Sequence, residues 1–240
     1  MRVAFFLGFF LASFICFSQN IKQVLDENAV VKDSAGTKYA PEVWKALLMH
    51  GYTIKAVDPG DANTEFLLVR LSDEEQARRL ERMPKPRESS FFKTGEKMGS
   101  FKTRDINGNK IDLKALEGKI VVLNFWFVNC SPCRMEIPDL NKMVDSFKTN
   151  NKIVFIAIAL DDRSILKSFL EKTPFNYNII DGGKFIADKY GVRSYPTHVV
   201  IDTEGKVYFH TSGLSTNTVY WLSKTIKELL SKTGEKTASN

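Results

Sequence analysis

Two cysteines separated by two residues, Cys130-Ser131-Pro132-Cys133, lie between an apolar run and a segment with helical character, and this placement constrains the fold most strongly. Residues 119–127 form a continuous run rich in β-branched residues, which predicts a buried strand. A helix is expected to follow from Cys130 to Phe147. The unpaired N–H groups and the positive dipole end of a helix N-terminus both stabilise a thiolate. The motif therefore predicts a reactive thiol pair.

The two positions predict different roles for the cysteines. We expect Cys130 to attack a disulfide of a partner protein, and Cys133, one turn inside the helix, to resolve the resulting mixed disulfide. Three other interpretations have less support. A structural disulfide closing so short a loop stabilises by only about 2 kcal/mol. Zinc needs four ligands, and the three histidines supply no second pair at close spacing. An inert buried pair is the third alternative.

A second motif, Tyr195-Pro196-Thr197, precedes an apolar strand expected over residues 197–201. A bond between any residue and proline can be cis, and a cis bond here would turn backbone groups toward the cysteines. An incoming peptide could pair with these groups as it pairs with the edge of a sheet. Together the two motifs predict a redox site with a place for a peptide.

Strands and helices alternate along residues 91–232, which predicts an α/β fold with a central mixed sheet covered by helices on both faces. A hairpin is expected over 101–113, with Asn107-Gly108 at its tip. The expected strands are 119–127, 153–160, 177–180, 197–201 and 207–210, and the expected helices are 130–147, 165–171, 185–190 and 215–231. The short turn between the last two strands makes that pair antiparallel.

The chain before this region predicts a further small α/β domain over residues 19–83, joined by a linker at 84–90 that contains two prolines and two serines. A helix beginning at Pro41, two strands and a short charged helix from Ser72 are expected in it. Trp44 is expected in the core of this domain. The residues after 232 form a polar tail over 233–240.

The N-terminus has the pattern of a secretory signal over residues 1–18. Arg2 precedes an apolar run from Val3 to Phe17, which is shorter than the roughly 18–20 residues that span a bilayer. Cleavage after Ser18 would leave Gln19 as the mature start and remove Cys16. The alternatives are a lipid on Cys16 and an uncleaved anchor, and membrane attachment is expected only in those two cases.

The charge pattern indicates no particular ligand. The net charge is +6 and 26% of the residues are charged, with acids and bases mixed along the chain. This mixture favours a solvated basic surface over nucleic-acid binding. We expect no nucleic-acid partner, no metal and no cofactor.

Four stretches together resemble the thioredoxin superfamily, and within it the exported TlpA/ResA-like branch. They are Leu123-Asn124-Phe125-Trp126, Cys130 to Pro138, Tyr195-Pro196-Thr197 and Ile201-Asp202-Thr203-Glu204-Gly205. The resemblance covers roughly residues 90–232. It implies a thioredoxin-like fold, a cis peptide before Pro196 and thiol–disulfide exchange. Residues 160–191 match an insertion typical of the branch.

Some positions depart from the usual pattern of the superfamily. Asn129 stands where Trp is usual, which replaces an aromatic contact surface by a small polar one. Asn124 stands where cytosolic thioredoxins carry a buried, proton-handling Asp, and Asn cannot titrate. The branch instead carries an acid after the motif, here Glu136, which would handle protons. The alternative interpretation of Glu136 is an ordinary solvated acid near the start of a helix. His198 is expected to be an ordinary polar residue of its strand.

The sequence and the resemblance together predict a site and an activity. The catalytic residues would be Cys130, Cys133 and Glu136, and the residues in contact with the partner would be Trp126, Asn129, Pro132, Tyr195, Pro196 and Thr197. The expected function is extracytoplasmic reduction of protein disulfides, with electrons from a membrane-bound dithiol donor. The resemblance suggests cytochrome c maturation as one pathway. The alternatives are a disulfide-forming oxidase or isomerase and a non-catalytic peptide-binding adaptor.

Overall fold

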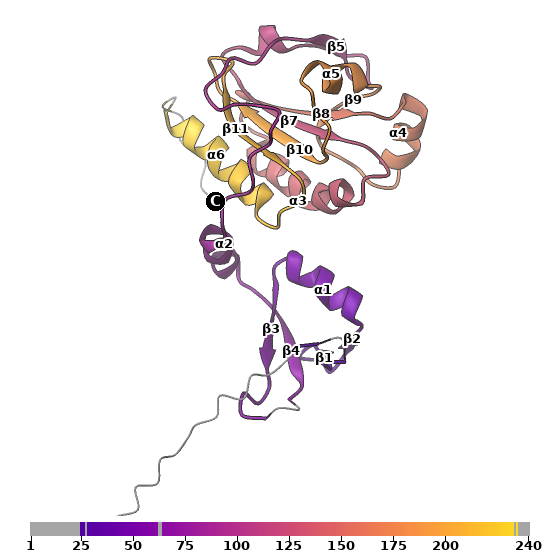
Figure 1. Cartoon of the computed structure of the whole chain (residues 1–240), viewed down its shortest axis with the longest axis vertical. Coiled ribbons are helices and arrows are strands. Elements are labelled where there is room, and N and C mark those ends of the chain that lie inside the picture. The colour runs from indigo at the N-terminus through magenta and orange to yellow at the C-terminus, as the bar shows by residue number, and fades with distance from the viewer. Residues whose placement is uncertain (1–24, 27, 62–63, 233, 235–240) are drawn as a thin grey trace, which may run out of the picture. The chain divides into compact units, whose positions relative to one another are not determined.

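The computed structural model describes residues 25–232 and 234, except residues 27, 62 and 63 (Figure 1). The predicted signal and most of the predicted tail lie outside the described residues. The chain divides into two compact units on either side of Ser72. No described helix combines the length and apolar character that a membrane crossing requires.

The first unit is a four-stranded sheet with one helix. The strand order is β2-β1-β4-β3, with β3 antiparallel and β1 parallel to β4. The elements are β1 (Val31–Lys32), β2 (Lys38–Tyr39), α1 (Pro41–Met49), β3 (Tyr52–Ala56) and β4 (Phe66–Arg70). Trp44 of α1 is 4% exposed and packs with Val31, Phe66 and Leu68, which confirms it as a core residue. The sequence did not predict β1 and β2, because strands of two residues show no periodicity.

The second unit is built on a five-stranded mixed sheet of order β11-β10-β7-β8-β9, and this confirms the predicted α/β architecture. Strands β7, β8 and β9 run parallel, while β10 is antiparallel to both β7 and β11. The strands are β7 (Ile120–Trp126), β8 (Ile153–Ala159), β9 (Asn178–Ile180), β10 (Thr197–Ile201) and β11 (Val207–Ser212).

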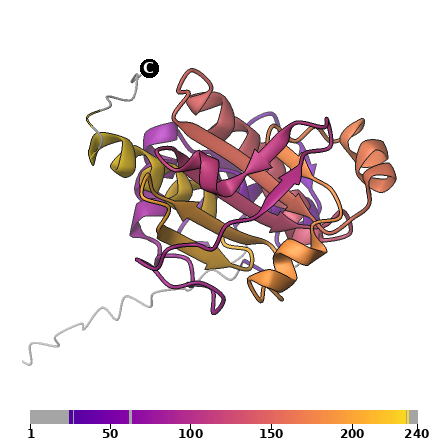
Figure 2. The same cartoon turned by 90° about the horizontal axis from the view of Figure 1, so that it is seen from above.

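Helices cover both faces of this sheet (Figures 1 and 2). The helices α3 (Ser131–Phe147), α4 (Arg163–Leu170) and α6 (Thr218–Lys232) contribute to one core cluster, and α5 (Lys184–Lys189) contributes to the other. The predicted hairpin is β5 (Lys102–Arg104) and β6 (Lys110–Asp112), followed by the short 3-10 helix Leu113–Leu116, and it packs on the α5 side. Along β7, Val122 and Trp126 face α3 while Leu123 and Phe125 face α5. This alternation places Asn124 on the α3 face.

Helix α2 (Asp73–Arg82) and the segment 84–90 group with the second unit. The sequence pattern predicts this helix in the first domain and a linker at 84–90. Asn217 donates from Nδ2 to the Pro84 carbonyl at 3.0 Å, and Thr211 donates from Oγ1 to the Arg87 carbonyl at 2.8 Å. The Ser89 N–H donates to His210 Nδ1 at 3.1 Å. We call residues 84–90 the strap. Its attachments use backbone groups, which leave no periodic pattern in a sequence.

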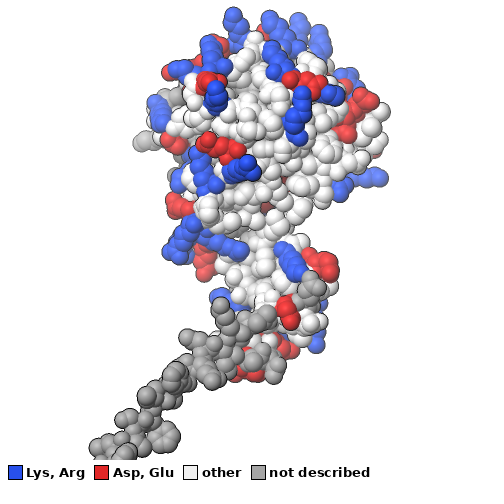
Figure 3. Space-filling view, viewed as in Figure 1, with Lys and Arg blue, Asp and Glu red and all other residues white. Residues whose placement is uncertain are grey.

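Acidic and basic side chains accompany one another over the face shown in Figure 3. Ion pairs of the described residues include Arg163 with Asp181 at 3.1 Å and Lys97 with Glu117 at 3.1 Å. The pairing agrees with the mixed charge pattern of the sequence.

Candidate active site

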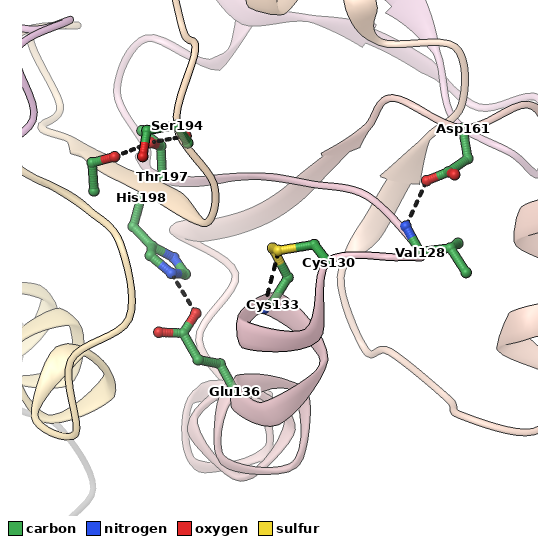
Figure 4. The surroundings of a disulfide bond; sticks show 9 residues. Val128, Cys130, Cys133, Glu136, Asp161, Ser194, Thr197 and His198 are labelled. Carbon is green, nitrogen blue, oxygen red and sulfur yellow. Dashed lines mark hydrogen bonds and ion pairs between the residues drawn. A yellow bond between two sulfur atoms is a disulfide. The ribbon is translucent and has the colours of Figure 1, made fainter.

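The two cysteines form a disulfide where β7 passes into α3 (Figure 4). Cys130 is the N-cap of α3, and its Sγ accepts a hydrogen bond from the Cys133 N–H at 3.2 Å. An N–H of the first helical turn, which has no partner within the helix, thus points at the sulfur that would carry a negative charge after reduction. The helix N-terminus therefore stabilises a thiolate on Cys130.

The two cysteines differ in burial. Cys130 is 5% exposed and Cys133 is 1% exposed. The order agrees with attack at Cys130 and resolution by Cys133, although both cysteines are buried in the disulfide form. A partner disulfide could therefore reach the disulfide of this protein only at the small exposed part of Cys130.

The loop before Cys130 is held by Asp161, which no motif of the sequence indicated. Asp161, just beyond the end of β8, accepts the Val128 N–H on Oδ2 at 2.7 Å. Because β7 and β8 are parallel, their carboxyl ends lie at the same edge of the sheet. The only sign of this contact in the sequence was the position of Asp161, directly after the strand predicted over 153–160.

The peptide bond between Tyr195 and Pro196 is cis, as the resemblance implied. Thr197 begins β10 and stands in register with Phe125 of β7. Its Oγ1 contacts the Ser194 carbonyl at 2.7 Å and Ser212 Oγ at 2.9 Å, so its side chain is occupied within the fold. Tyr195 is half-buried, with its ring 5.5 Å from that of Phe127 in an edge-to-face arrangement.

A buried polar pair lies on the inner side of α3. Nε2 of His198, on β10, lies 2.9 Å from Oε2 of Glu136, and their side chains are 0% and 4% exposed (Figure 4). Glu136 is therefore not a solvated helix position. His198 is not an ordinary polar residue of a strand either, because the alternation along β10 turns it with Val200 toward the α3 side. That alternation was the signal in the sequence.

The structure separates the predicted partner-binding residues. Asn129 is exposed and Pro132 is half-buried beside the disulfide. Trp126 is 0% exposed, with its ring 5.7 Å from Phe169 and 5.5 Å from Phe175. The prediction that Trp126 contacts a partner is thus wrong, because its ring is fully enclosed in the core. Pro196 and Thr197 are also buried.

Within the described ranges, no group of three or more His, Cys, Asp or Glu residues is arranged to hold a metal ion. The site consists of the disulfide, the helix N-terminus, the cis-proline loop and the buried Glu136–His198 pair. Such an arrangement can exchange a disulfide with a partner and can hold a proton beside it.

Similarity to known proteins agrees with this chemistry. Residues 94–210 match the AhpC/TSA family. The thiol-disulfide oxidoreductase ResA of Halalkalibacterium halodurans is 31% identical over 58% of this chain and 80% of its own length. ResA of Bacillus anthracis is 38% identical over 49% of this chain and 72% of its own length. The chain belongs to the thioredoxin-like ResA thiol-disulfide oxidoreductases.

Solved structures extend the same relationship. One from Chlorobium tepidum, assigned as the thiol:disulfide interchange protein DsbE, is 28% identical with a TM-score of 0.53, over 58% of this chain and 99% of that chain. One from Bacteroides thetaiotaomicron, assigned as a protein disulfide isomerase, is 29% identical with a TM-score of 0.54, over 58% and 91%. The protein is thus a thiol-disulfide oxidoreductase that acts on protein thiols and disulfides.

Proposed function

We propose that this protein is an exported reductase that keeps selected extracytoplasmic protein thiols reduced, with cytochrome c maturation as one target pathway. In the reduced enzyme, the Cys130 thiolate attacks a partner disulfide and one partner sulfur leaves as a thiolate. Cys133, once deprotonated, then attacks Cys130 Sγ, which re-forms the Cys130–Cys133 disulfide and releases the second partner sulfur. A membrane-bound dithiol donor returns two electrons and two protons to the enzyme.

The observation that favours a reductase over an oxidase is the buried position of Glu136. Its carboxyl group is buried on the same face of α3 as Cys133, and its hydrogen-bond partner is His198. The pair has no net positive charge while it holds a single proton, whichever residue carries that proton. A strong oxidant needs a heavily stabilised thiolate, and a carboxylate near the cysteines works against one.

An oxidase or isomerase is the second candidate, because the N–H donated to Cys130 Sγ favours the thiolate and one similar structure is assigned as a protein disulfide isomerase. The reduction potential separates the two candidates. Equilibration against glutathione or dithiothreitol should give a value near that of thioredoxin, about −270 mV. A value above about −180 mV, the range of protein disulfide isomerase, would exclude the reductase.

Two features of the sequence support export: Arg2 followed by the apolar run Val3 to Phe17, and the small residues Cys16 and Ser18 near the expected cut. N-terminal sequencing of the protein from a bacterial host should find Gln19 or a residue within a few positions. An intact Met1 would indicate an anchor, and a blocked Cys16 carrying lipid would indicate a lipoprotein.

A further inference from the structure

The buried pair of Glu136 and His198 belongs partly to the same helix as the less exposed cysteine. Cys133 and Glu136 are three residues apart on α3, so both lie on its inner face. His198 reaches the Glu136 carboxyl group from β10 (Figure 4). The helix that carries Cys133 and the buried pair beside it thus combine two elements that are distant in the sequence.

Each member of the pair has the other as its hydrogen-bond partner. In the described part of the chain, Glu136 Oε1 and His198 Nδ1 are buried and without any other partner. Burying an isolated carboxylate is costly, so alone it would keep its proton. An imidazole at 2.9 Å removes that restriction, because the proton can lie on either residue while the pair stays neutral.

The residues around the pair do not compete with it for this proton. Asn124 and Thr211 stand in register with His198 on β7 and β11, and neither titrates. Tyr177 also faces Glu136, but burial, followed by the charge of Glu136, raises the pKa of its phenol far above the usual value. Helix α6 packs on the same face with uncharged buried residues, from Thr218 to Leu230. Cys133, on the same face of α3, is the group that must lose a proton during resolution.

We propose that His198 is a positioning residue that keeps Glu136 ionised, so that the carboxylate can accept the proton of Cys133 during resolution. The proposal rests on the role of Cys133 given above. The Cys133 thiol passes its proton to the Glu136 carboxylate, and the resulting thiolate attacks Cys130 Sγ. The bond between Cys130 and the partner breaks, and the partner leaves as a thiolate that takes a proton from water.

Stopped-flow reaction of the reduced protein with dithionitrobenzoate tests this step. The first thionitrobenzoate is released when Cys130 attacks the reagent, in a phase that depends on reagent concentration. The second is released when Cys133 resolves the mixed disulfide, in a phase that does not. The rate of the second phase does not depend on the reduction potential of the protein. The proposed reductase function could therefore be wrong while this proposal is right, and the two experiments distinguish these cases.

His198→Gln should slow the second phase at pH 6–7 by roughly 100-fold, the lower end of the range of general-base effects. The deficit should shrink as the pH approaches 9, where a thiol of ordinary pKa, about 8.5, ionises without help. Glu136→Gln should show the same profile, and the double variant should lose little more than either single variant. The first phase should stay close to that of the wild type.

His210→Gln is the matched control, because His210 is a buried histidine of the same sheet that binds Ser89 of the strap instead. It should leave both phases unchanged. A His198→Gln profile that runs parallel to that of the wild type at all pH values would mean a merely structural role and would overturn the proposal. If His198→Gln does not fold, a wild-type profile in Glu136→Gln would overturn it equally.

Discussion

Cys130 and Cys133 share one helical turn but differ in their surroundings. Cys130 caps the helix and receives an N–H, and it is the more exposed of the two. Iodoacetamide at mildly acidic pH should therefore modify Cys130 of the reduced protein first, because its thiolate is favoured. Peptide mapping by mass spectrometry after partial alkylation measures the order. Faster labelling of Cys133 would reverse the assigned roles.

Asp161 offers a second prediction about a single residue. Replacing it by Ala leaves the half-buried Val128 N–H without its acceptor, and a hydrogen bond of this kind contributes about 0.5–1.5 kcal/mol. Asp161→Ala should lower the melting temperature and change the rate of Cys130 alkylation, since the loop leading to Cys130 loses its tether. Asp162→Ala is the control, because the Asp162 side chain makes no capping hydrogen bond on α4. Equal effects of the two variants would refute the tether.

Among the secondary-structure elements, the strap depends on pH through His210. Burial is the main cause that lowers the pKa of His210 below its usual value of about 6.5. The neutral ring accepts the Ser89 N–H, and the protonated ring cannot. Since the folded-state pKa is lowered, this contribution to stability is complete above about pH 6.5 and is lost as the pH falls below it.

Limited trypsin digestion at Arg87, which is exposed, measures attachment of the strap. Cleavage should accelerate between pH 7 and pH 5.5 after correction for the activity of trypsin. His210→Gln should remove most of this dependence. An unchanged dependence in that variant would assign it to another group.

The elements that the sequence predicted best are those with long apolar patterns. The buried strands β7, β8 and β10 and the helix α3 were predicted within a few residues, because core burial imposes a period on them. The attachment of the strap and the bond from Asp161 could not be predicted, because each joins a backbone group to a distant side chain. Trp126 was misassigned because its position in the motif does not show which face of β7 is enclosed.

For the whole molecule, the structure predicts where the redox unit can be cut. A chain beginning at Asp73 keeps α2 and the strap, and we expect it to fold and to reduce insulin as the full chain does. A chain beginning at Ser90 loses the bonds to Thr211, His210 and Asn217, each worth about 1 kcal/mol. Each such loss lowers the melting temperature of a unit of this size by about 2–4 °C. Equal melting temperatures of the two chains would show that the strap contributes nothing.

The division of the site among separate elements has a consequence for how such a protein can diversify. The cysteines lie at the start of α3, and α3 and β10 carry the buried Glu136–His198 pair, whereas Asn129 and Tyr195 lie in the loops before α3 and before β10. Loop positions tolerate exchange far better than packed ones. New client proteins could therefore be acquired by substitution in these loops while the redox machinery is inherited unchanged, and a designer could graft loops from relatives onto this scaffold in the same way.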